Sequence, residues 1–113
     1  MFLFQTKSSC ARLSMREAAQ EIKQDPAIRL LDVRTRQEHE SGHIPGSANL
    51  PLDQINRAAE LFPDKRTRLF VYCQSGARSQ RACAQLSAAG YTNITNIGGM
   101  QDWTGKTERG RIR

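Results

Sequence analysis

Apolar residues along the chain recur at two spacings, one typical of helices and the other of short buried strands. Between residues 15 and 22 they fall at i, i+3, i+4 and i+7, which is one face of an amphipathic helix. Ser14 and Glu17 form a capping-box pattern that predicts the start of this helix. The Asp25-Pro26 pair predicts its end, because proline cannot continue a helix.

The same alternation continues to the end of the chain. Short, nearly continuous apolar runs predict strands at 28–33, 48–50, 69–72 and 93–97. Helical patterns lie between them at 36–40, 55–62 and about 79–89. Thr35 and Glu38 make a second capping box, and Gly90 occupies the position that commonly ends a helix. Strands that alternate with helices favour a parallel sheet covered on both faces, an α/β fold.

Length and composition indicate one domain. The 113 residues suffice for one core, and 38% hydrophobic with 25% charged residues is ordinary for a globular protein. We expect a single domain over 1–113, with its core at about 13–104 and a basic tail at 105–113. No apolar run approaches the ~20 residues that span a membrane, and the apolar start, residues 1–4, is too short for a signal peptide. These features predict a soluble, cytoplasmic protein.

The net charge of +6 changes this picture little. Four of the basic residues lie in the tail: Lys106, Arg109, Arg111 and Arg113. A basic tail can contact nucleic acid, but this one has no interleaved aromatic residues and no recognition motif. We therefore favour a solvated, frayed terminus over a nucleic-acid patch. The positive charge would still attract small anions.

The three cysteines are Cys10, Cys73 and Cys83, an odd number without a CxxC pair. This pattern argues against a disulfide scaffold and suits a reducing compartment. The two histidines have no cysteine at zinc-finger spacing, so no metal site is predicted. Cys83 shares a helix face with Ser79 and Leu86 and is interpreted as a small core residue, whereas Cys10 has no charged neighbours that would activate it.

Cys73 stands where the chemistry of an α/β fold is usually found. It follows the buried strand 69–72, at the carboxyl end where ligands bind in open sheets. The small residues Ser75, Gly76 and Ala77 let backbone N–H groups turn inward before a helix begins, which stabilises negative charge. With Arg78 nearby, the pKa of the thiol should fall. The alternative is a buried, inert cysteine beside an ordinary turn.

Four motifs in order resemble the rhodanese family. The segment 73–79 (CQSGARS) looks like its active-site loop, and Asp32-Val33-Arg34 resembles its DVR motif. Glu38 with residues 42–51 (GHIPGSANLP) is similar to its E…GHIPGAxNxP segment, and Gly98-Gly99 with Trp103 resembles its closing element. The resemblance spans roughly residues 13–103.

This resemblance implies a five-stranded parallel sheet with helices on both sides and the transfer of a sulfane sulfur without any cofactor. Cys73 would take the outer sulfur of thiosulfate or a protein persulfide, become a persulfide, and pass the sulfur to cyanide or a thiol. Loop residues would bind the donor and hold the anionic sulfur: Gln74, Ser75, Gly76, Ala77, Arg78 and Ser79. This assignment requires loop amides that face the sulfur and a cavity above it.

For the other residues near the loop, a role in binding or catalysis competes with a structural one. Arg78 either contacts the donor's sulfonate or, as we favour, pairs with Asp32 or Glu38 to hold the loop. Arg34 either recruits the anionic donor or is an ordinary surface residue. Asp32 is expected to satisfy backbone or arginine groups, and His43 to stabilise its turn by a hydrogen bond. Trp103 is expected to anchor the final turn.

Three other functions compete with thiosulfate sulfur transfer. Phosphatases and arsenate reductases of related architecture use a loop one residue longer, Cys-x5-Arg, whereas four residues separate Cys73 from Arg78 here. A non-catalytic binding module is disfavoured because relatives of that kind commonly lack the loop cysteine. A protein-to-protein sulfur carrier would use the same loop and stays open.

Overall fold

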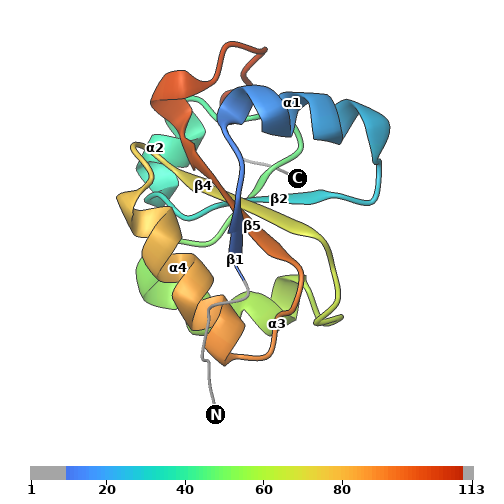
Figure 1. Ribbon diagram of the computed structural model, residues 1–113. Helices are drawn as coiled ribbons and strands as arrows, with labels where there is room; N and C mark the ends of the chain where they lie inside the picture. Colours follow the sequence, from blue (N-terminus) through green and yellow to red (C-terminus); the bar gives the residue numbers. More distant parts are fainter. Residues whose placement is uncertain (1–9, 111–113) are drawn as a thin grey trace.

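The computed structural model describes residues 10–110, which fold around one five-stranded parallel sheet (Figure 1). The strands are β1 (Cys10–Arg12), β2 (Arg29–Asp32), β3 (Ala48–Asn49), β4 (Leu69–Cys73) and β5 (Ile94–Gly99). Their spatial order is β1-β5-β4-β2-β3, and every neighbouring pair is parallel. The predicted α/β fold is confirmed. Strand β1 was not predicted, because its three residues are mostly exposed and carry no apolar pattern.

Within the described residues, four α-helices and one 3₁₀ helix connect the strands, and a second 3₁₀ helix follows the last strand. The helices are α1 (Met15–Gln24), α2 (Arg36–Ser41), α3 (Ala58–Leu61) and α4 (Ala77–Ala88), with 3₁₀ helices η1 (Leu52–Arg57) and η2 (Met100–Asp102). Both predicted capping boxes are present. The single helix predicted over 55–62 is wrong: this stretch is divided between η1 and α3, and Arg57, where the two meet, has non-helical dihedral angles, with φ −94° and ψ 9°. Helix α4 begins two residues earlier than predicted, directly after Gly76.

The sheet separates two hydrophobic cores. On one face η1, α3 and α4 pack against the strands through residues such as Ile55, Phe62 and Leu86, and on the other α1 does so through Met15 and Ala18 (Figure 1). Every residue of β4 is buried because this strand is central and covered on both faces. Its carboxyl end therefore holds Cys73 at the centre of the sheet.

The C-terminal segment returns to the domain. The backbones of His43 and Glu108 exchange two hydrogen bonds of 2.8 and 2.9 Å, and the Gly110 N–H donates to the Glu40 carbonyl at 2.7 Å. The frayed terminus that we expected is therefore wrong for this stretch as far as Gly110. Its side chains are exposed, but its backbone is paired. The rest of that prediction, on residues 111–113, lies outside the described part of the chain, as does the apolar start.

Within residues 10–110 the longest helix, α4, has 12 residues, and none of the helices is long and apolar enough to cross a membrane.

Candidate active site

Cys73 lies at the carboxyl end of β4, under the loop 74–76 that leads into α4. The N–H of Gly76 points at the sulfur and donates a hydrogen bond to Sγ at 2.9 Å. The Ser79 hydroxyl, one turn into α4, lies 3.5 Å from the same sulfur. Gly76 adopts a φ of 105°, a left-handed conformation that glycine tolerates, and this turn directs its N–H inward. The loop thus has the inward amide that the sequence predicted.

These hydrogen bonds lower the pKa of the Cys73 thiol. Burial alone would raise it, but hydrogen bonds from the Ser79 side chain and from the backbone of Ser79, Gly76 and Ser75 outweigh burial. We expected the charge of Arg78 to contribute strongly, and the main causes are instead these short-range hydrogen bonds. The result is a larger thiolate fraction, the reactive form of cysteine.

The Gly98-Gly99 pair shapes the loop from the neighbouring strand. A Cβ atom on Gly99 would lie 2.2 Å from the Gln74 carbonyl oxygen and 2.6 Å from the Ser75 Cα, so only glycine fits there. The β4–β5 pairing is also irregular at this point, because Val71 pairs with Asn96 and the next residue with Gly98. The Gly-Gly element therefore allows β5 to approach the loop backbone directly.

Arg34 is buried in an ion pair behind the loop. Its guanidinium donates to both carboxylate oxygens of Asp32 at 2.8–3.1 Å and to the Gly42 carbonyl at 2.7 Å. The remaining nitrogen donates to Gln74 Oε1 at 3.3 Å. Because Arg34 is only 4% exposed, its interpretation as a surface residue is wrong. The structure shows it as a residue that ties the DVR motif to the active loop.

Asp32 has the role that the sequence predicted for it. Its side chain is fully buried, accepts hydrogen bonds from Arg34, and lies 2.9 Å from the His39 Nδ1. Burial alone would raise the pKa of this carboxyl, but hydrogen bonds with His39 and Arg34 outweigh burial and lower it, so the group stays ionised. His39 was missed by the sequence analysis, because only the fold brings α2 against the end of β2.

Arg78 pairs with Glu38, as favoured from the sequence. Two of its nitrogens donate to the two carboxylate oxygens at 2.8 and 3.0 Å, a bidentate bridge between α4 and α2. Glu38 also caps α2 through Thr35. Chiefly because of the Arg78 hydrogen bonds, the pKa of Glu38 falls from its ordinary value of 4.5 to about 2.

His43 stabilises its turn, as predicted. Its Nδ1 donates to the His39 carbonyl at 2.8 Å, and its ring stacks on His39 with centroids 3.8 Å apart. Trp103 packs on the α1 face of the sheet, and its indole N–H donates to the Lys106 carbonyl, which fits the predicted anchor. In the part of the chain that the structure describes, no three acidic, His or Cys side chains gather as a metal-binding group.

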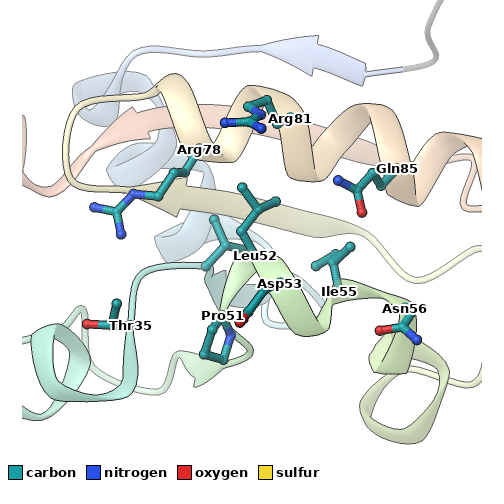
Figure 2. Close-up of a pocket in the computed structure, with 10 residues that line it drawn as sticks. Thr35, Pro51, Leu52, Asp53, Ile55, Asn56, Arg78, Arg81 and Gln85 are labelled. Carbon is teal, nitrogen blue, oxygen red and sulfur yellow. The ribbon is translucent and has the colours of Figure 1, made fainter.

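A cavity of about 620 Å³ opens between η1 and α4, beside the active loop (Figure 2). Apolar residues such as Leu52 and Ile55 line one side, and Arg78 and Arg81 lie along the other. Cys73 is not part of its lining and is only 1% exposed. The requirement for inward amides is met at Gly76, whereas the requirement for open access to the sulfur is not met in this conformation.

Comparison with known proteins decides the family. Residues 14–106 match the model of the family described as "Rhodanese-like domain". The chain belongs to the rhodanese family. Its central strand, glycine-shaped loop and buried cysteine are thus parts of a rhodanese domain.

Among curated relatives, the chain is 36% identical over 102 residues to "Putative sulfur carrier protein YrkF" of Bacillus subtilis, with 89% of this chain and 55% of the relative covered. It is 38% identical over 73 residues to "Thiosulfate sulfurtransferase PspE" of Escherichia coli, with 64% and 70% covered. The chain thus spans about half the length of the first relative. Among solved structures, "rhodanese with anions from E. coli" has a TM-score of 0.70 at 35% identity, with 74% of this chain and 100% of that chain covered.

Proposed function

We propose that this rhodanese domain is a sulfurtransferase that moves a sulfane sulfur from thiosulfate or a persulfide donor to a thiophilic acceptor, through a persulfide on Cys73. One observation carries the proposal: the Gly76 N–H donates to Cys73 Sγ at 2.9 Å at the carboxyl end of the central strand. That contact supports a thiolate before the reaction, and loop amides of the same kind would support the anionic outer sulfur after it.

The reaction balances as two displacements at sulfur. The Cys73 thiolate attacks the outer sulfur of thiosulfate; a sulfur–sulfur bond forms to Cys73, the bond to the sulfonate sulfur breaks, and sulfite leaves with the electron pair. Cyanide then attacks the outer sulfur of the persulfide, thiocyanate forms, and the Cys73 thiolate is regenerated. This ping-pong sequence needs no cofactor.

Access to the sulfur is the step that the resting geometry does not provide. Gln74 and Ser75, the two residues after Cys73, are exposed, whereas Cys73 itself is 1% exposed. We infer that these two residues move aside, or turn, when the donor enters, while Gly76 keeps its contact with the sulfur. In this movement Gln74 would give up the hydrogen bond of 3.3 Å that its side chain accepts from Arg34.

The test is intact-mass analysis after incubation with thiosulfate, followed by addition of cyanide. We expect one added sulfur on Cys73, its loss with cyanide, and release of thiocyanate. Cys73→Ser should abolish both adduct and transfer, whereas Cys83→Ser, a matched change at a second buried cysteine, should keep them. Transfer that survives Cys73→Ser and is lost in Cys83→Ser would overturn the proposal.

A sulfur-carrier role is the second candidate, favoured by the similarity to a relative named as a putative sulfur carrier. A carrier accepts sulfur from a protein persulfide much faster than from thiosulfate, whereas a thiosulfate enzyme shows the reverse. Comparing the rate of Cys73 persulfide formation with the two donors separates these functions. For either function we propose a cytoplasmic location, where thiol reductants keep Cys73 reduced.

A further inference from the structure

Cys10 and Cys83 lie at a second cavity, which shares no lining residue with the cavity of Figure 2. Cys10 opens β1, where its Cα is paired with Ile94 of β5, and its side chain packs against the core cluster that contains Cys83. Both cysteines line one cavity of about 180 Å³, together with Arg12, Gln80, Ala84 and Asn96. The two thiols lie close enough to shift each other's pKa, and Cys10 Sγ donates a hydrogen bond to the Ala11 carbonyl oxygen at 3.4 Å. Sequence analysis treated them separately, because β1 was not predicted.

The two sulfurs differ in exposure and in charge. Cys10 is half-buried, whereas Cys83 is 1% exposed. The pKa of Cys10 is lowered, chiefly by its interaction with Cys83 and further by a backbone hydrogen bond of Asn96 and the charge of Arg12, although partial burial opposes this. The expectation that no charged neighbour acts on Cys10 is therefore wrong. The pKa of Cys83 is raised by the same interaction, by burial and by the charge of Cys10. Cys10 is thus the accessible nucleophile, and Cys83 is the protonated inner thiol.

We propose that Cys10 and Cys83 form a second thiol site, a dithiol that low-molecular-weight disulfides oxidise to an internal disulfide without involving Cys73. The Cys10 thiolate attacks one sulfur of the disulfide, forms a mixed disulfide and expels one thiolate. Cys83 then loses its proton to solvent, attacks the Cys10 sulfur and expels the second thiolate. One disulfide is reduced to two thiols, and the two cysteines lose two electrons in all.

The second step becomes easier once the first has occurred. Once Cys10 is part of a mixed disulfide, it has no thiolate charge and no longer interacts with Cys83 as a thiol. These are two of the causes that raise the pKa of Cys83, so that pKa should fall. The two sulfurs must then approach to the disulfide bond length of about 2.05 Å. Cys10 stands at the start of the edge strand β1, where the backbone can make this adjustment with little disturbance of the core.

This dithiol lies next to the active loop without belonging to it. Asn96 lines the small cavity, and its Oδ1 accepts a hydrogen bond of 2.8 Å from the Ser79 hydroxyl. Ser79 is also the residue whose hydroxyl contacts Cys73 Sγ. Cys83 follows Ser79 by one turn of α4. A disulfide would link β1 to α4 at this level.

The experiment treats the reduced protein with glutathione disulfide, blocks the remaining thiols with an alkylating reagent and maps the peptides. We expect a Cys10–Cys83 linked peptide and an alkylated or glutathionylated Cys73. Cys73→Ser should form the same link, which separates this proposal from the sulfurtransferase function. The wild-type result stands by itself if that variant does not fold.

Two single variants test the roles of the two thiols. In Cys83→Ser, glutathione should remain attached to Cys10, because the resolving thiol is missing. In Cys10→Ser, Cys83 should react about tenfold or more slowly than Cys10 does, because it is buried and protonated. The proposal is overturned if both cysteines are alkylated after oxidation, if glutathione persists on Cys10 in the wild-type protein, or if Cys83 reacts first.

Discussion

At the scale of single residues, the active loop depends on a position without a side chain. Gly99 lies against the backbone of Gln74 and Ser75, so a methyl group there must displace the loop. We predict that Gly99→Ala lowers the free energy of unfolding by about 1–3 kcal/mol, the usual cost of overpacking, and slows sulfur transfer at least about tenfold, because the amide of Gly76 shifts relative to the sulfur.

The measurements for Gly99→Ala are urea unfolding and thiocyanate release. Gly42→Ala is the matched control, because a Cβ there meets nothing within 4 Å and the backbone is extended. Similar behaviour of the two variants would contradict the claim that β5 shapes the loop.

Arg34 offers a second residue-scale prediction, in which stability and substrate binding separate. Replacing it with alanine leaves the buried Asp32 carboxylate without its cation, which typically costs about 3–5 kcal/mol. Arg34→Lys keeps the charge and is the milder variant. If Arg34 also attracts the anionic donor, KM for thiosulfate rises more than kcat falls, relative to Arg16→Ala on the exposed face of α1. An unchanged KM in folded Arg34→Lys and Arg34→Ala would leave Arg34 with a positioning role only.

At the scale of elements, the Glu38–Arg78 bridge joins α2 to α4 and should make stability depend on pH. The pKa of Glu38 in the folded protein, about 2, lies below its ordinary value of 4.5. The bridge therefore contributes fully above pH 4.5, and its contribution is lost as the pH falls toward 2. The side chains are about one-third exposed, so the effect is a modest one that solvent screens.

The measurement is the urea midpoint between pH 6 and pH 2.5. We expect a shallower decline for Glu38→Gln than for the wild-type protein, and a lower midpoint near pH 6. Asp102→Asn, an exposed carboxylate on η2, is the control and should follow the wild-type curve. Parallel curves for Glu38→Gln and the wild type would mean that the bridge adds no stability.

The elements also show what the sequence can and cannot predict. Capping boxes and apolar periodicity located α1, α2 and the central strands, because those signals are local and strong. Strand β1 is stabilised by pairing with β5 and has no pattern of its own, so it was missed, and with it the contact between Cys10 and Cys83. The motifs located Cys73 and its loop. The burial of Arg34 was not predictable, because it depends on how α2 packs against the sheet.

At the scale of the whole molecule, the basic C-terminal segment closes the domain beyond the end of the family match at residue 106. The backbone bonds between His43 and Glu108 and between Gly110 and Glu40 are each worth about 1 kcal/mol net. We predict that a chain stopped after residue 106 loses about 1–3 kcal/mol of unfolding free energy, partly offset by the conformational entropy that the released turn regains.

A chain stopped after Gly110 is the control for this prediction, since it keeps all three backbone hydrogen bonds and the His43–Glu108 contact. Equal urea midpoints for the two shortened chains would show that this closure contributes nothing to stability. A lower midpoint for the shorter chain alone would show that a segment outside the family pattern stabilises the turn at His43, which packs behind the active loop through His39 and Asp32.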